Sequence, residues 1–127
     1  MKRIIIYMFL LFVIAFQLMS CYKDVILPDV AVDPDGPPQP VSFSAELKPM
    51  FTSQCALSGC HSVGNHKPYL TQDIAWAEIV NGGFVNTLVP KQSTLYIMIN
   101  GPMKEYIPNA SDRQKVYDWI RNGAPNN

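Results

Sequence analysis

The chain has 127 residues, of which 48% are hydrophobic and 16% are charged, and its 10 Lys and Arg residues balance its 10 Asp and Glu residues. This length is enough for one small domain. The even charge balance lacks the basic excess of nucleic-acid-binding proteins, so we expect no nucleic acid among its partners.

The N-terminal segment has the pattern of a secretion signal. Lys2 and Arg3 form a short basic start, an almost unbroken apolar run follows, and Ser20 precedes Cys21. The run is short for the roughly 20 residues of a membrane-spanning helix. A cysteine at the cleavage point is similar to a bacterial lipoprotein signal, which predicts a signal peptide over 1–20 and lipidation of Cys21. The alternative is a simple membrane anchor with an incidental cysteine.

The segment after Cys21 is rich in proline and aspartate up to about Val41 and has few large apolar side chains. This composition is typical of an extended tether. We therefore predict a flexible linker over 21–41 and a folded domain over 42–127. Under both interpretations of the N-terminal segment, this domain is exported from the cytoplasm. The lipoprotein interpretation anchors it by lipid to a membrane of the bacterial cell envelope, facing the periplasm or the cell surface.

The folded part is predicted to be all-α, because short helical patterns alternate with loops and no alternating run long enough for a useful strand is present. The four expected helices run from a Ser44 cap to Phe51, from a Thr71 cap to Val80, from Ser93 to a stop at Gly101, and from a capping box of Ser111 and Gln114 to a stop at Gly123.

The most informative segment is CALSGCH, which contains Cys55, Cys60 and His61. Two thiols on one short loop can each add to a vinyl group of the same porphyrin, and the histidine that follows then becomes an axial ligand of the iron. Four residues separate the cysteines instead of the usual two, and Gly59 can supply a backbone conformation that other residues avoid. The segment predicts one covalent haem c held by Cys55 and Cys60, with His61 on the iron.

The same side chains allow two other interpretations. A Cys55–Cys60 disulfide would close only a small loop and would stabilise the fold little. A zinc ion could take both thiols together with His61 and His66, although the adjacent Cys60 and His61 fit poorly as two corners of one tetrahedron. Either alternative leaves the domain without haem.

Two further short motifs lie downstream in a fixed order. With the haem segment they make the region from about Phe43 to Asn127 resemble a small monohaem cytochrome c domain of bacterial lipoproteins. The matching residues are Val89, Pro90, Ser93, Leu95 and Tyr96 in the first motif, and Trp119, Ile120, Gly123 and Ala124 in the second.

The resemblance implies a cytochrome c-like fold of three to four short helices around one haem, with a methionine as the second axial ligand. Met103 is the preferred candidate, because it lies in a loop between glycine and proline residues and beside Lys104, an odd place for a packing side chain. Met98, Met50 and His66 are the alternative candidates for this ligand, but Met98 and Met50 fall within predicted helices and are interpreted as core residues.

The resemblance also assigns supporting roles near the haem. Trp119 is expected to line the porphyrin, and the backbone carbonyl of Pro90 is expected to accept a hydrogen bond from Nδ1 of His61.

With both axial positions filled, the iron has no open site for a substrate, so the expected activity is the transfer of single electrons between redox partner proteins. An open-haem enzyme or a gas-binding protein is the alternative if Met103 does not bind the iron. A haem-free structural lipoprotein with a Cys55–Cys60 disulfide is the third possibility.

Overall fold

The computed structural model describes residues 33–127, so the predicted signal peptide, Cys21 and the first part of the predicted linker lie outside the described residues. Within 33–127 the chain is helical and contains no strand, which confirms the predicted all-α class. No helix in this range is both long enough and apolar enough to cross a membrane.

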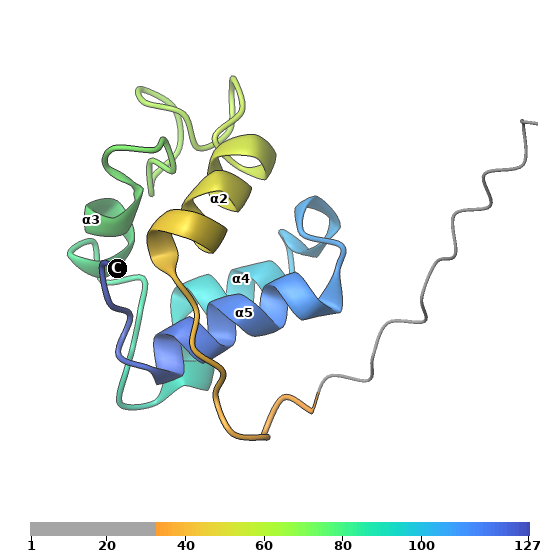
Figure 1. Cartoon of the computed structure of the whole chain (residues 1–127). Coiled ribbons are helices and arrows are strands. Elements are labelled where there is room, and N and C mark those ends of the chain that lie inside the picture. Colours follow the sequence, from red (N-terminus) through yellow and green to blue (C-terminus); the bar gives the residue numbers. More distant parts are fainter. Residues whose placement is uncertain (1–32) are drawn as a thin grey trace, which may run out of the picture.

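Four short α-helices form the frame of the domain. Helices α4 and α5 lie side by side, α2 lies across from them, and the long loop between α2 and α3 forms one end of the molecule (Figure 1). The α-helices are α2 (Lys48–Gln54), α3 (Ala75–Val80), α4 (Thr94–Asn100) and α5 (Ala110–Arg121), joined by a π-helical turn η1 (Phe43–Leu47) and two 3₁₀ turns, η2 (Pro90–Gln92) and η3 (Lys104–Tyr106).

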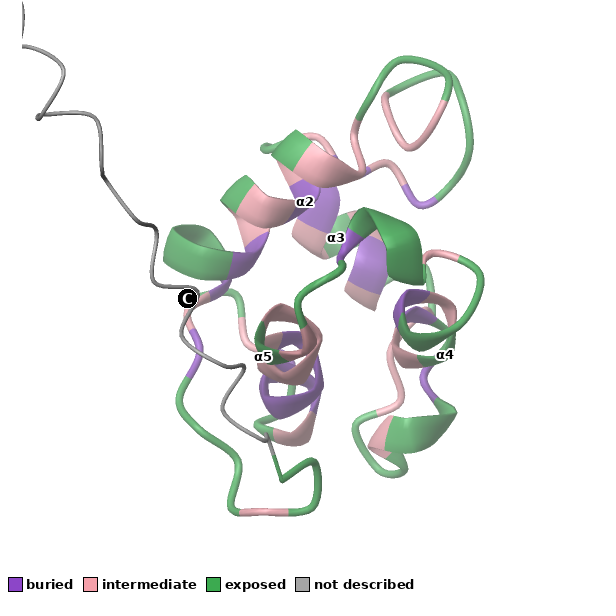
Figure 2. Cartoon of the chain, turned by 90° about the vertical axis from the view of Figure 1, so that its right-hand side faces the viewer, coloured by how far each residue is buried: buried purple, intermediate pink, exposed green. Residues whose placement is uncertain are grey.

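The core forms where the inner faces of these helices meet, as the buried positions in Figure 2 show. The rings of Phe43 and Trp119 lie 5.3 Å apart between centroids, and Phe51 follows 6.4 Å from Phe43. The buried apolar cluster comprises Val41, Phe43, Leu47, Phe51, Leu70, Ala75, Ile79, Leu95, Ile99, Ile107, Val116, Trp119, Ile120 and Ala124.

The first helical segment begins two residues earlier than predicted. Ser42, not Ser44, is the N-cap: its hydroxyl accepts a hydrogen bond from the backbone N–H of Ala45 at 3.2 Å. In return, the Glu46 carboxylate accepts the N–H of Ser42 at 3.0 Å. The hydroxyl bond has the usual spacing of three residues, whereas the carboxylate lies four residues after the cap, at the start of a π-helical turn.

Of the two middle helices, α4 agrees with the prediction in position, whereas α3 begins at Ala75, later than a cap at Thr71 predicts. Helix α4 begins directly after Ser93 and ends directly before Gly101, as expected. Helix α3 ends at Val80, but no side chain caps its start. Thr71 instead contributes its backbone carbonyl, which accepts the N–H of Ala75 at 3.0 Å.

The predicted capping box of α5 is wrong. Helix α5 begins at Ala110, and Ser111 already lies inside it. The start is shifted because the carbonyl of Asn109 accepts the N–H of Arg113, while the Arg113 guanidinium donates to the carbonyls of Ile107 and Pro108 at 2.6 Å each. Arg113 thus fixes the chain entering the helix.

Helix α5 ends as predicted at Gly123, which has a φ of 89°. The N–H of Gly123 donates to the carbonyl of Ile120, and the N–H of Ala124 donates to that of Trp119. These two bonds form a Schellman motif, which requires a left-handed residue after the helix. The Trp119 indole N–H donates to the carbonyl of Pro125 at 2.9 Å, so its one polar atom is satisfied within the core.

The described end of the predicted linker is attached to α5. Arg121 donates to the carbonyl of Gly36 at 2.7 Å, and the side chain of Asn122 donates to the carbonyl of Gln39 at 2.8 Å. The carboxylate of the buried Asp118 pairs with Arg121 at 2.7 Å. The chain from Gly36 onward therefore belongs to the structured unit.

Candidate cofactor site

A cavity of about 420 Å³ lies between α2, the loop that follows it, α4 and the η3 region. It brings together four predicted site residues, namely Cys55, Cys60, His61 and Met103. Its volume falls within the roughly 300–1,000 Å³ that is typical of cofactor pockets. The apolar part of its wall consists of Phe51, Pro68, Leu70, Phe84, Leu95, Met98, Ile99 and Ile107.

A tight turn accommodates the wide spacing of the cysteines. The N–H of Cys60 donates to the carbonyl of Leu57 at 2.9 Å, and Gly59, the third residue of that turn, has a φ of 81°. A positive φ at this position is what a type II turn requires. The N–H of His61 then donates to the carbonyl of Cys55 at 3.1 Å, which closes the loop and brings the second thiol and the imidazole to the cavity.

We expect Gly59→Val to destabilise the domain by about 1–2 kcal/mol, the cost of a left-handed backbone for a residue with a side chain. The loss of stability would come from the strained backbone and not from a steric clash, because a Cβ atom at Gly59 has no other atom within 4 Å. Gly59→Asn is the matched control, because asparagine tolerates this conformation. Denaturant unfolding measures both variants, and equal losses would contradict the turn argument.

The ring of His61 is oriented by backbone carbonyls. Its Nδ1 lies 3.0 Å from the carbonyl oxygen of Pro68 and 3.2 Å from that of His66. A carbonyl can only accept, so in the neutral imidazole Nδ1 carries the proton and Nε2 keeps its lone pair. Histidine ligands of metals are commonly oriented by such an acceptor.

The predicted supporting roles of Pro90 and Trp119 are not found in this arrangement. The carbonyl beside Nδ1 of His61 belongs to Pro68, whereas the carbonyl of Pro90 accepts the N–H of Ser93. Neither Pro90 nor Trp119 lines the cavity. Trp119 lies behind its wall, in the same buried cluster as the lining residue Phe51.

Cys55 and Cys60 form no disulfide within the described part of the chain, and both are half-buried. Burial, together with the nearby Cys60, raises the pKa of the Cys55 thiol from 9.0 to about 11. This thiol is therefore neutral at physiological pH, as expected for a side chain in a largely apolar pocket. Among residues 33–127, no three His, Cys, Asp or Glu side chains gather as a metal site, so the zinc alternative is not assembled here.

Two methionines of the described range 33–127 line the cavity, where the sequence predicted one. Met103 lies there as expected, and Met98 from α4 lies there too. Met50 packs against the buried core, in agreement with its predicted role. The interpretation of Met98 as a core residue is wrong, because within 33–127 it belongs neither to the buried cluster nor to the side chains packed against it.

The cavity wall also holds polar groups that the sequence did not single out. The Oε1 atom of Gln54 is buried and has no hydrogen-bond partner in the described part of the chain. A buried acceptor without a partner costs about 1–3 kcal/mol, and an occupant with a polar atom would remove that cost. His66, a ligand in the zinc alternative, also lines the cavity, and Lys67, Thr94 and Tyr106 complete the polar part of the lining. A thiol pair, an oriented imidazole, thioethers and an apolar wall fit a covalent haem.

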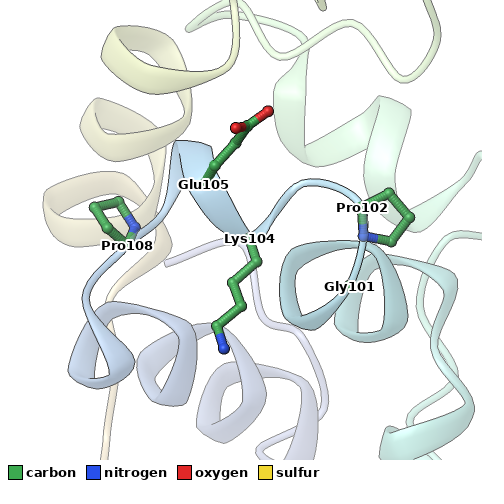
Figure 3. A pocket seen from close by; sticks show the side chains of 5 residues that line it. All are labelled: Gly101, Pro102, Lys104, Glu105 and Pro108. Atoms are coloured by element: carbon green, nitrogen blue, oxygen red, sulfur yellow. The ribbon is translucent and has the colours of Figure 1, made fainter.

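A wider depression of about 570 Å³ lies beside this cavity and has a different character. It is lined by Gly101, Pro102, Lys104, Glu105 and Pro108, and the side chains of Lys104 and Glu105 point to opposite sides of it (Figure 3). It contains no thiol, imidazole or thioether, so the chemistry predicted from the sequence belongs to the smaller cavity.

Comparisons of the chain with protein-family models, with curated proteins and with solved structures give no match.

Proposed function

We propose that this chain is a membrane-anchored c-type cytochrome that carries single electrons outside the cytoplasm. The observation that supports the proposal most directly is the convergence of Cys55, Cys60, His61 and Met103 on one cavity. These residues come from two separate regions of the sequence, and only a folded chain brings the methionine to the cysteine loop.

Each side chain has a defined task in this proposal. Cys55 and Cys60 hold the haem by two thioether bonds, and His61 binds the iron through Nε2 while Pro68 keeps the proton on Nδ1. Met103 would supply a second ligand to the iron. Haem held in this way changes reversibly between the ferrous and ferric states, and a thioether ligand raises its reduction potential.

The apolar wall contributes to the same task. Phe51, Leu95 and Ile99 are buried side chains that line the cavity and keep water from it. A low-polarity surrounding disfavours added charge and thereby adjusts the potential. The chain itself needs to move no proton and to bind no substrate for electron transfer.

We expect Met103→Ala to lower the reduction potential of the haem-loaded protein and to let carbon monoxide bind its ferrous form, because the variant lacks the thioether of Met103. Potentiometric titration and absorption spectra with carbon monoxide measure both effects. Ready binding of carbon monoxide to the unmodified protein would contradict the electron-carrier proposal and favour an open-haem enzyme or a gas-binding protein.

Attachment to a membrane is a separate part of the proposal and rests on Cys21, outside the described residues. We expect Cys21→Ser to release the protein from membranes or to leave an uncleaved signal, because lipidation requires that thiol. Cell fractionation and the size of the product measure the outcome. Unchanged processing and unchanged membrane association would favour the simple N-terminal anchor.

A further inference from the structure

Met98 and Met103 present two thioether side chains to one cavity from one part of the fold. Leu95 lies three residues before Met98 and four before Ile99 on α4, the i, i+3 and i, i+4 spacings that place all three on one helix face. Leu95 and Ile99 are buried and line the cavity, so this face of α4 forms part of its wall. The side chain of Met98 is thereby directed to the cavity.

The backbone links the two methionines closely. The N–H of Met103 donates to the carbonyl of Met98 at 2.8 Å, directly after the turn at Gly101 and Pro102. His61 comes from a different wall, the loop between α2 and α3. Met98 and Met103 thus line the cavity from α4 and the turn that follows it, and both residues are half-buried.

The Met98 side chain is not needed to fill the core. Within 33–127 it lies outside the buried cluster and outside the side chains packed against that cluster, in contrast to Met50. A methionine side chain is unbranched and rotates about three bonds, so it can adapt its reach. A flexible thioether at a cavity wall is free to follow the occupant.

We propose that Met98 is a second sulfur donor to the haem iron, which takes the axial position when Met103 leaves it. This inference rests on the proposed haem function. It assigns to Met98 a role in keeping the iron closed to external ligands. The exchange replaces one neutral thioether by another and therefore needs no oxidant, reductant or proton.

The test compares haem-loaded Met103→Ala with the double variant Met103→Ala/Met98→Leu. Leucine nearly conserves the volume of methionine, so the double variant is expected to fold. If Met98 occupies the axial position about nine-tenths of the time in Met103→Ala, the apparent affinity for carbon monoxide is about tenfold weaker than in the double variant. The reduction potential of Met103→Ala should also lie above that of the double variant.

The matched control is Met103→Ala/Met50→Leu, which removes a methionine outside the cavity and should behave like Met103→Ala alone. Equal carbon monoxide affinities and equal potentials for Met103→Ala and for the variant that also lacks Met98 would overturn the inference. Failure of the proposed function is visible separately, because the unmodified chain would then carry no haem or would itself bind carbon monoxide.

Discussion

Cys60→Ala is expected to leave the chain with little or no covalent haem when it is produced with a haem c maturation system. The variant would lose one of the two proposed thioether bonds, directly beside His61, the proposed ligand of the iron. Staining for haem after denaturing electrophoresis, normalised to the amount of chain, measures the effect, because only covalently bound haem survives denaturation.

The control for this variant is Ser58→Ala, an exposed position in the same loop that keeps both thiols. It should retain the haem content of the unmodified protein. Unchanged haem content in Cys60→Ala would contradict attachment through this cysteine, whereas equal losses in both variants would show that the loop and not the thiol matters.

Trp119→Ala is expected to reduce the free energy of unfolding by about 3–5 kcal/mol, the usual cost of deleting a large buried aromatic side chain. Trp119 is fully buried, packs against Phe43 and donates to the carbonyl of Pro125. Denaturant unfolding measures the loss. Because Trp119 lies behind the cavity wall, molecules that remain folded should keep the haem absorption spectrum of the unmodified protein.

Trp119→Phe separates the two contributions of this side chain. Phenylalanine retains most of the apolar contact but has no N–H for Pro125, so a loss of about 1 kcal/mol is expected, the typical net value of one hydrogen bond. A changed haem absorption spectrum in Trp119→Ala and Trp119→Phe, with an unchanged free energy of unfolding, would contradict this placement. It would show that Trp119 contacts the haem.

Features set by local sequence could be predicted. The all-α class followed from short helical patterns separated by loops. The bounds of α4 followed from the apolar pattern between Ser93 and Gly101. The role of Gly59 followed from the need to fit four residues between two thiols of one loop. The placement of Met103 at the cysteine loop was predicted through the resemblance to monohaem cytochromes, and the cavity brings these residues together.

Features that depend on tertiary packing could not be predicted. Nothing in the order of residues says that the carbonyl of Pro68, not that of Pro90, would meet Nδ1 of His61, because that contact depends on how the loop folds back. Trp119 and Met98 are both apolar side chains on helices, and only packing sends the first to the core and the second to the cavity. The unpartnered Oε1 of Gln54 likewise has no sequence signal.

The intact mass of the purified protein under denaturing conditions tests the central claim most directly. The chain should be produced in a bacterial strain that matures other c-type cytochromes, and its mass should exceed that of the polypeptide by one haem. Addition of one haem, together with its absence when Cys55 and Cys60 are both replaced by alanine, is the result that we predict. A polypeptide mass without haem, from cells in which other cytochromes c carry theirs, would contradict the account.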